Sequence, residues 1–244
     1  MPSNIRRVDK LSEVIARELV DEIVRDQLGE EDTLPSEAAM AARFKVGRGT
    51  LREALRILEV LGLIVIKTGP GGGPVVKALT SHQFARTSTF YFNVAGVTFR
   101  QVEEARQLLE PLMARQAASN VTKAFERSVR ENVRQTQRSE GDEWVHATRR
   151  FHQLIRSQVN NPVLDLYGGS LMTLYSERIH EGAAPLDRDV ICGEHEEIAE
   201  ALLSRSPDKA EALMRAHLIS YMSAIDGPYS PMLDEVIGWA SSRG

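Results

Sequence analysis

Two groups of side chains in this sequence have the types and spacing that could do chemistry. In the first group, Arg48, Arg52 and Arg56 recur every four residues, so a helix would carry them on one face. Guanidinium groups on such a face can pair with guanine edges or bind phosphates. Residues 43–56 hold five basic residues and one acid, whereas residues 1–77 hold 12 of each, so the positive charge is local. The alternative is a solvated amphipathic helix whose arginines face water.

The second group consists of three histidines, His152, His195 and His217, each of which lies within a helical pattern. No pair has the spacing of a zinc finger or of an H-E-x-x-H site. Side chains from three helices can still converge in the core of a bundle and bind a divalent metal there. The alternative is that each is an ordinary core histidine, and spacing alone leaves both interpretations open.

The basic face belongs to a helix with a recognisable start and end. Apolar periodicity predicts a first helix over about residues 10–27. Ser36 is a suitable N-cap for a short second helix, "EAAMAARF". A third helix is expected from about residue 49 to 61, where Gly62 supplies a left-handed end and Leu51, Leu55 and Leu58 face the first two helices.

The third helix is followed by "LIVIK" and "GPVVK", two β-branched runs on either side of "TGPGG". This pattern predicts a hairpin with a flexible tip. The order helix, helix, turn, helix, ribbon is that of a winged helix-turn-helix, whose third helix enters the major groove. The combination favours a DNA-reading head over a solvated helix.

After the hairpin the periodicity is helical only. Helices are predicted at about residues 80–94, 99–119, 122–138, 142–159, 163–180, 187–204 and 207–224, with one more short helix in the tail. We therefore expect a mainly α fold with two domains. Residues 1–78 would form a winged helix-turn-helix of three helices and a two-stranded wing. Residues 79–244 would form an all-α antiparallel bundle of about seven helices.

Composition bears on location and partners. The net charge of −4 does not indicate a nucleic-acid partner by itself. The one cysteine, Cys192, excludes an intrachain disulfide and fits a reducing compartment. The first ten residues lack the apolar stretch of a signal peptide, and the longest apolar run is too short to span a bilayer. We expect a cytoplasmic protein without a membrane partner.

The segment "LPSEAAMAARFKVGRGTLREALRILEVLGLIVIKTGPGGGPVV" resembles the DNA-binding domain of GntR-type bacterial transcription regulators over nearly its full length. The resemblance implies that Arg48, Thr50 and Arg52 contact a double-stranded DNA operator. It also implies that Thr68 and Gly69 form the contact made by the wing.

Two positions depart from the pattern of these regulators. Many relatives carry an arginine where this sequence has Ala38, and most carry a serine or threonine where it has Gly47. One expected DNA contact and one hydroxyl on the phosphate side are therefore missing. Arg56 lies deeper along the helix and is expected to be solvated.

Three further segments, "QVEEARQLLEPLMARQAA", "FHQLIRSQVNNPVL" and "EHEEIAEALLSRSPDKAEALMRAHL", resemble in order and spacing the FCD effector-binding domain of the FadR branch. The resemblance implies a metal site of one aspartate and three histidines, with the histidines at His152, His195 and His217. The aspartate position, one helical turn before the first histidine, holds Thr148.

Three imidazoles still suit Zn²⁺, with Ni²⁺, Mn²⁺ or Fe²⁺ as alternatives, and they leave positions for water or an effector carboxylate. The competing interpretation is a metal-free, partly apolar pocket for an acyl-CoA, and both stay open. The predicted effector-binding residues are Thr148 and Arg106, which stands where relatives direct an arginine into the pocket. Arg106 could instead form a salt bridge with Glu103 or Glu110. His146 and His180 match no ligand position.

Together these patterns predict a ligand-responsive regulator and not an enzyme. Two bundles would pair as a homodimer, two heads would read a palindromic operator, and a small organic acid would relieve repression. A metal-dependent hydrolase is the alternative from a different class, because three histidines with open positions resemble a hydrolytic zinc site. That alternative leaves the head unexplained, and no acid or base beside the histidines stands out in the sequence. An architectural DNA binder would leave the histidines unexplained.

Overall fold

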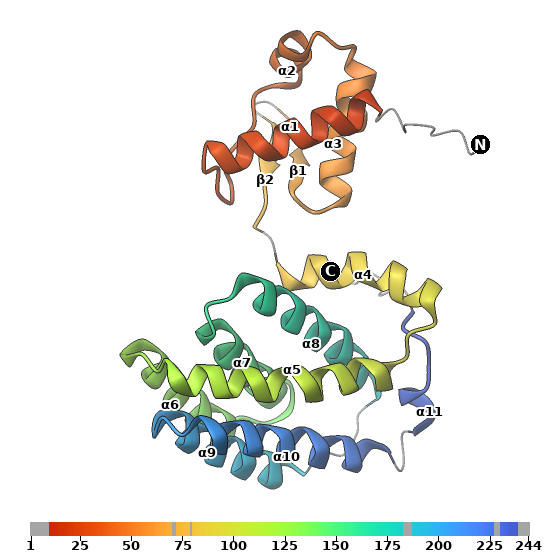
Figure 1. Cartoon of the computed structure of the whole chain (residues 1–244). Helices are drawn as coiled ribbons and strands as arrows, with labels where there is room; N and C mark the ends of the chain where they lie inside the picture. Colours follow the sequence, from red (N-terminus) through yellow and green to blue (C-terminus); the bar gives the residue numbers. More distant parts are fainter. Residues whose placement is uncertain (1–9, 70–71, 79, 183–186, 227–229, 239–244) are drawn as a thin grey trace, which may run out of the picture. The chain divides into compact units, whose positions relative to one another are not determined.

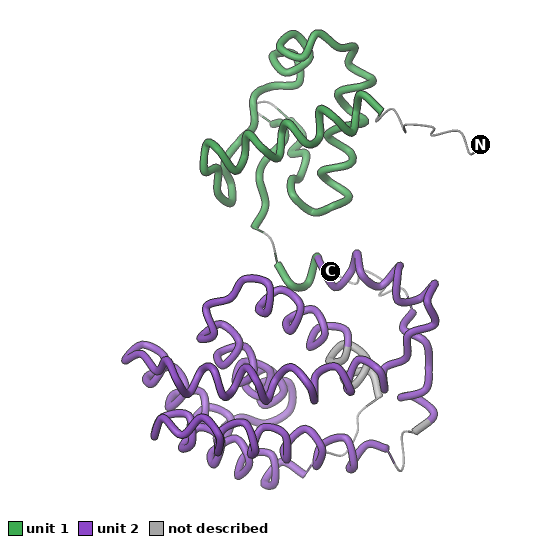
Figure 2. The backbone as a smooth tube through the Cα atoms, in the orientation of Figure 1, with its two compact units in different colours: residues 1–83 green, residues 84–244 purple. Residues whose placement is uncertain are grey.

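A computed structural model describes residues 10–69, 72–78, 80–182, 187–226 and 230–238, with backbone only for 175–182 and 230 (Figure 1). The chain divides into two compact units, residues 1–83 and 84–244 (Figure 2). The described residues form helices and one two-stranded antiparallel sheet, so the predicted fold class is confirmed. No helix in the described part of the chain is long and apolar enough to cross a membrane.

The first unit contains three helices and a hairpin. Its elements are α1 (Leu11–Arg25), α2 (Glu37–Phe44), α3 (Arg48–Val60), β1 (Ile64–Lys67) and β2 (Gly73–Val76). The predicted leucine face of α3 is buried, because Leu51, Leu55 and Leu58 pack with Leu19 of α1 and Met40 of α2 in one apolar core. The opposite face of α3 is left to the arginines.

The turns around α2 and α3 follow local chemistry. The Ser36 hydroxyl accepts a hydrogen bond from the Ala39 backbone N–H at 3.3 Å, which caps α2 as expected. Lys45 takes the left-handed conformation, with φ of 54°, in the turn between α2 and α3. Gly62 follows the end of α3 with φ of 74°, the left-handed position that favours glycine.

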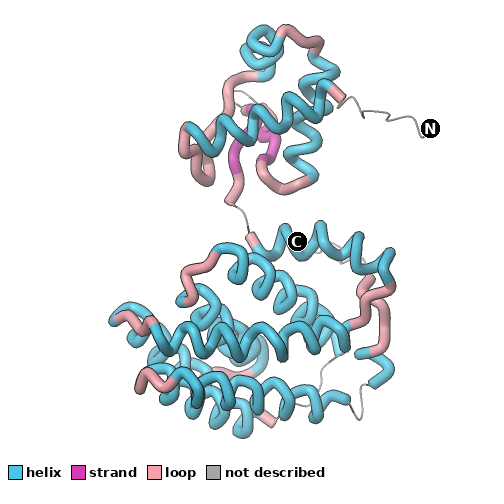
Figure 3. The backbone as a smooth tube through the Cα atoms, viewed as in Figure 1, coloured by secondary structure: helices cyan, strands magenta, loops and turns pink. Residues whose placement is uncertain are grey.

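The predicted wing is a true antiparallel pair, in which Ile64 lies opposite Val76 and Lys67 opposite Gly73 (Figure 3). The Gly72 N–H donates to the Gly69 carbonyl at 2.9 Å across the turn. The predicted flexible tip also includes residues 70–71, which lie outside the described residues.

The segment between α1 and α2 binds the wing, although its sequence indicates only a loop. Thr33 forms an isolated antiparallel bridge with Val75. The Leu34 N–H donates to the Pro74 carbonyl at 2.9 Å, and the Val76 N–H donates to the Asp32 carbonyl at 2.8 Å. Backbone hydrogen bonds therefore fix β2 on both of its edges.

The rest of the chain is helical, in accord with its periodicity. The helices are α4 (Ser81–Ala95), α5 (Phe99–Ser119), α6 (Lys123–Arg138), α7 (Gly141–Gln158), α8 (Pro162–Gly182), α9 (Arg188–Leu203), α10 (Pro207–Asp226) and α11 (Ser230–Leu233). The predicted bounds of α4 to α10 hold to within two residues. The Asn161 side chain accepts hydrogen bonds from the N–H groups of Val163 and Leu164, which starts α8 where the Asn-Pro pair indicates.

Helix α5 is central to the second unit and packs against α7, α8, α9 and α10 (Figure 1). Its buried residues meet Phe151, Ile198, Leu202 and Met214 in the main apolar core. Pro111 lies inside α5, where it lacks the N–H that would bond the Gln107 carbonyl. Arg215 of α10 donates to that carbonyl at 3.5 Å. This contact between α10 and α5 replaces in part the backbone hydrogen bond that the proline removes.

We predict that Ser36→Ala lowers the free energy of unfolding of the first unit by about 1 kcal/mol, because the α2 N-terminus loses its cap. Urea unfolding of the full chain, followed by circular dichroism, measures this change. Ser36→Asp is the matched control and should keep most of the stability, because a carboxylate caps equally well. Equal stability of Ser36→Ala and wild type would contradict the assignment of Ser36 as the cap.

Candidate functional site

The first turn of α3 presents the residues that the sequence assigns to DNA. Arg48 is exposed and has no ion-pair or hydrogen-bond partner among the described residues. Arg52 is also exposed, and its Nε donates to Glu37 Oε2 of α2 at 2.9 Å. Thr50 lies between them and is half-buried. The structure thus brings the two arginines to one helix start, and Glu37 holds one of them in place.

Two other arginines of the basic stretch are engaged elsewhere. Arg56 pairs with Glu59 of its own helix at 2.5 Å. Arg43 forms a two-point salt bridge with Glu22 of α1, with distances of 3.0 and 2.6 Å, and its guanidinium lies 4.6 Å from the Phe44 ring centre. Part of the local positive charge counted in the sequence therefore stabilises the α1–α2 packing and is not presented by α3.

Gly47 is the N-cap of α3 and has ordinary extended dihedrals, with φ of −67° and ψ of 153°. A Cβ placed there would meet no atom within 4 Å. The helix start consequently lacks a side-chain cap, and the N–H groups of its first turn are left for other acceptors.

The predicted wing contacts, Thr68 and Gly69, are both exposed and directly follow β1. Gly69 has φ of 101°, which a residue with a side chain rarely adopts. Lys67, the last residue of β1 before the turn, pairs with Glu31 at 2.5 Å, and Lys77, which follows β2 at the base of the wing, pairs with Glu30 at 3.2 Å. These lysines are neutralised by the segment that follows α1.

The three predicted metal ligands come together in the second unit. His152 of α7, His195 of α9 and His217 of α10 are all buried, and one ring nitrogen of each lies within 4.8 Å of the others. The ring centres are 4.8 to 5.3 Å apart. Three helices that are distant in the sequence thus place three imidazoles around one point.

Two carboxylates orient two of these rings. His152 Nδ1 lies 2.5 Å from Glu110 Oε2, and His217 Nδ1 lies 2.7 Å from Glu194 Oε2. An ionised carboxylate only accepts hydrogen bonds, so each Nδ1 carries the proton and donates it. The lone pair is then on Nε2, the tautomer that metal-binding histidines with a carboxylate partner adopt.

His195 has no such partner. Neither of its ring nitrogens has a hydrogen-bond partner among the described residues, although both are buried. The ring stacks on Phe151 with centres 4.1 Å apart. Burial, followed by the neighbouring His217 and His152, lowers the pKa of His195 well below its usual value, and burial also lowers the pKa of His152. A buried imidazole with an unused lone pair fits a metal ligand, so the donor set suits a divalent ion.

Arg106 lies in a buried charged row along α5. Its Nη1 donates to Glu103 Oε2 and its Nε donates to Glu110 Oε1, both at 2.7 Å. Burial raises the pKa of Glu103 to about 7 despite Arg106. Burial would also raise the pKa of Glu110, but Arg106 and His152 outweigh it and hold that pKa far below its usual range. The salt bridges that the sequence offered as the alternative are thus present, and the effector role of Arg106 stays a prediction.

Thr148 lies one turn before His152, as expected, and is half-buried. Its hydroxyl donates to the Trp144 carbonyl at 2.5 Å, so it is engaged within α7 and does not join the histidine cluster. His146, which matches no ligand position, is exposed. The side chain of His180 lies outside the described residues.

Glu110 and Glu194 are the residues that sequence reasoning missed, because no acid beside the histidines stood out. Glu194 directly precedes His195 but bonds His217, 23 residues later. Glu110 is 42 residues from His152. The one available signal was the acid next to a candidate ligand in "GEHEE", and it points to the wrong histidine.

Comparison with known proteins covers both units. Residues 11–72 match the gntR family of bacterial regulatory proteins, and residues 101–220 match the FCD domain. Over 224 residues the chain is 27% identical to the HTH-type transcriptional repressor NanR of Salmonella newport, a match that spans 86% of this chain and 84% of that protein. NanR of Salmonella typhimurium is equally similar, with 86% and 82% covered.

A solved structure of a GntR protein from Streptococcus agalactiae has the same fold, with a TM-score of 0.71 and 21% identity over 88% of this chain and 100% of that one. The two family matches take in both the arginines of α3 and the three histidines. Both family matches are to transcriptional regulators and not to enzymes, so the hydrolase alternative for the three histidines is set aside. The chain therefore belongs to the GntR family of bacterial regulatory proteins and is a ligand-responsive, DNA-binding transcriptional regulator with an FCD domain.

Proposed function

We propose that this regulator is a repressor that binds a palindromic operator as a homodimer and releases it when a small carboxylate effector binds the bundle. The convergence of three buried imidazoles, one of them without a hydrogen-bond partner in the described part of the chain, carries this proposal. A buried polar group without a partner is rare in proteins and calls for a ligand, a metal or water. The similar proteins named as repressors support the direction of regulation.

We further propose that the chain belongs to the FadR branch and acts in the cytoplasm. The helix α4, which precedes the "LEP" helix α5, supports the branch, since that branch has an extra helix at this place. A regulator that binds chromosomal DNA works where the DNA is, which supports the location.

In the proposed head, α3 enters the major groove and Arg48 and Arg52 reach base edges or phosphates. The Glu37 carboxylate limits the positions that the Arg52 guanidinium can adopt, which reduces the entropy lost on binding. The N–H groups of the first turn suit a phosphate, and Thr50 offers a hydroxyl in the same turn. Thr68 and Gly69 contact the backbone next to the groove.

In the proposed effector site, Nε2 of His152 and His217, together with a nitrogen of His195, would hold the metal. A bound Zn²⁺ or similar ion would act as a Lewis acid for an effector carboxylate. Glu110 and Glu194 keep two rings in the required tautomer and orientation. Because Thr148 contributes no charge, three neutral imidazoles would leave the ion positive and favour an anionic effector.

The alternative of a metal-free pocket for an acyl-CoA has less support. A site for a lipophilic chain is lined mostly by apolar side chains. Two of the three imidazoles instead contact carboxylates, and Glu110 continues into the charged row with Arg106.

Regulation requires that DNA and effector differ in affinity for the same two states of the dimer. The effector contacts helices α7, α9 and α10 in this proposal, so its binding changes how these helices pack. A change in packing that favours one pairing of the two bundles would alter the spacing of the two heads.

We predict that Arg48→Ala and Arg52→Ala each weaken specific operator binding by about 1–3 kcal/mol, because each removes a charged contact to a base or phosphate. Fluorescence anisotropy on a site selected from random DNA measures the loss. Arg56→Ala is the matched control and should bind like wild type. Undiminished affinity of the Arg48→Ala Arg52→Ala double variant would contradict the proposal that α3 binds the operator. An affinity for DNA that does not fall as the salt concentration rises would contradict it as well.

We predict that the tag-free protein contains a divalent metal or takes up Zn²⁺ after chelation, whereas His195→Phe does not. Phenylalanine keeps the stack on Phe151 but has no lone pair to offer. Elemental analysis and calorimetric titration with Zn²⁺ measure occupancy and affinity. His146→Phe, a change at an exposed histidine of α7, should bind metal like wild type. Wild-type protein that neither contains nor acquires metal would remove the three-histidine site from the proposal.

A further inference from the structure

The segment that follows α11 returns to the corner between α4 and α5. The Ile237 N–H donates to the Val97 carbonyl at 2.9 Å, and Val236 forms an isolated antiparallel bridge with Thr98. Figure 1 shows this segment beside the corner that joins the two helices. Residues 232–237, which we call the C-terminal clasp, are thus bound through their backbone to the turn after α4.

Side chains join the clasp to three helices. Arg100, in the first turn of α5, donates from Nε to Asp234 Oδ1 at 2.7 Å and from Nη2 to Asp226 Oδ1 at 2.8 Å. Asp226 is the last residue of α10. Asn93 of α4 donates from Nδ2 to the Ile237 carbonyl at 2.9 Å. The clasp therefore connects the end of α4, the start of α5 and the end of α10.

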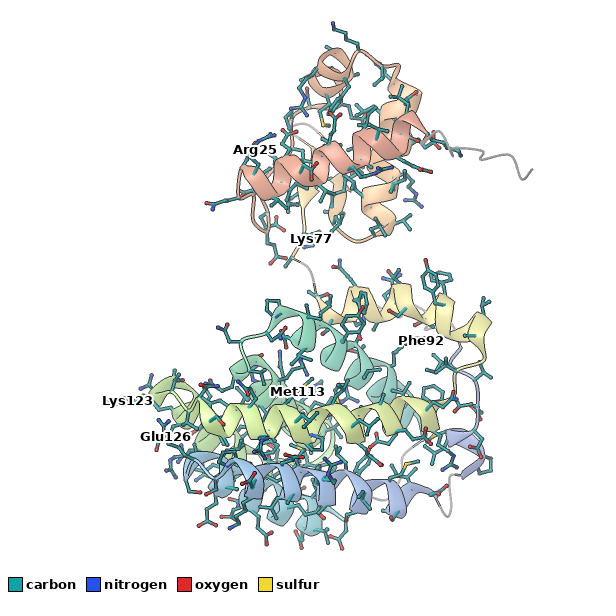
Figure 4. All side chains as sticks on the ribbon, viewed as in Figure 1. Arg25, Lys77, Phe92, Met113, Lys123 and Glu126 are labelled. Carbon is teal, nitrogen blue, oxygen red and sulfur yellow. The ribbon has the colours of Figure 1, made fainter. Side chains whose placement is uncertain are left out.

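The clasp also completes a second apolar cluster of the bundle. Its Leu233 and Ile237 are buried together with Phe99 of α5 and Ile225 of α10. Phe92 of α4, which Figure 4 labels, packs against the same cluster. None of these side chains belongs to the main apolar core of the unit. Without the clasp, this end of α4 would lose apolar as well as polar contacts.

Helix α4 itself has a light hold on the bundle. Its buried side chains are Ala85 and Thr89, which are both small. Near its start, the Phe84 ring meets the Tyr167 ring of α8 edge-on, with centres 5.0 Å apart. Because small side chains bury little area, the contacts of the clasp are a substantial part of what fixes the direction of α4.

The direction of α4 matters because this helix carries the DNA-binding head. Strand β2 ends at Val76 and α4 begins at Ser81, so the connection is four residues long and reaches about 14 Å at most. The 15 residues of α4 make it about 22 Å long. A rotation of about 15°, a size known from allosteric proteins, would move its start by about 6 Å. That displacement exceeds the rise of one base pair, about 3.4 Å.

We propose that the C-terminal clasp sets the direction of α4 and thereby the spacing of the two heads on the operator. This inference rests on the proposed homodimer and its palindromic operator. Helix α10 carries His217 and ends at Asp226, so Arg100 joins a helix of the histidine cluster to the corner that directs α4. A change in the packing of α10 would reach the heads through this corner.

The test compares the binding of the full-length protein to two duplexes by fluorescence anisotropy. One is the palindromic operator selected from random DNA, and the other is the same duplex with one half-site scrambled. Wild type should prefer the palindrome, because one dimer binds both half-sites at a high effective concentration. Arg100→Met keeps the stem of the side chain but removes both ion pairs. It should lower this preference by about tenfold, while the scrambled duplex binds as it does to wild type.

Arg115→Met is the matched control. Arg115 also lies on α5 and also pairs with two acids, Asp208 and Glu211 of α10, but at the other end of the helix. This variant should keep the wild-type preference for the palindrome. Asp234→Asn removes one of the two ion pairs of Arg100 and should lower the preference by a smaller factor. It replaces Arg100→Met in the test if that variant does not fold.

Light scattering reports whether each variant is still a dimer. A folded, dimeric Arg100→Met with the wild-type preference would overturn the role of the clasp and leave the palindromic operator standing. Loss of the dimer together with the preference would also overturn it, because the clasp would then serve assembly and not the spacing of the heads. If wild type binds both duplexes equally, the proposed palindromic binding itself fails, and the role of the clasp fails with it.

Discussion

The Glu110 carboxylate is the group on which the interior of the second unit depends. One oxygen binds Arg106 of the same helix and the other binds His152 of α7, so it connects a buried cation to the histidine cluster. A carboxylate this deeply buried is tolerated only when charged partners surround it. Its charge in turn requires that His152 carry its proton on Nδ1, which leaves Nε2 available. Helix register, tautomer and ligand geometry are therefore coupled through a single side chain.

The sequence was sufficient for the secondary structure because the signals are local. Apolar periodicity, Ser36, Gly62 and the Asn-Pro pair at residue 161 each act within a few residues of themselves. The pairing of residues 32–34 with β2 could not be anticipated in the same way. It uses backbone groups, which every residue carries, so no side-chain pattern distinguishes that segment from an ordinary loop.

In the candidate site, too, some residues could be predicted from the sequence and others could not. Three histidines could be proposed as a set because a family resemblance aligned them, and their convergence is now visible in the structure. Their carboxylate partners come from across the bundle, 42 and 23 residues away along the chain. Arg43 was counted with the DNA-facing charge, although its pairing with Glu22 depends on how α1 crosses α2. Long-range pairings of charged groups are set by packing, which local pattern does not contain.

The open space around Gly47 has a bearing on how such a regulator changes over evolution. The residue has dihedrals that any amino acid can adopt, and a Cβ there would meet no atom within 4 Å. The first carbon of a new side chain at this helix start therefore meets no steric obstacle, while each substitution alters the surface next to Arg48. The position offers a route by which duplicated copies of the gene can acquire different target sites before any compensating change in the core is needed.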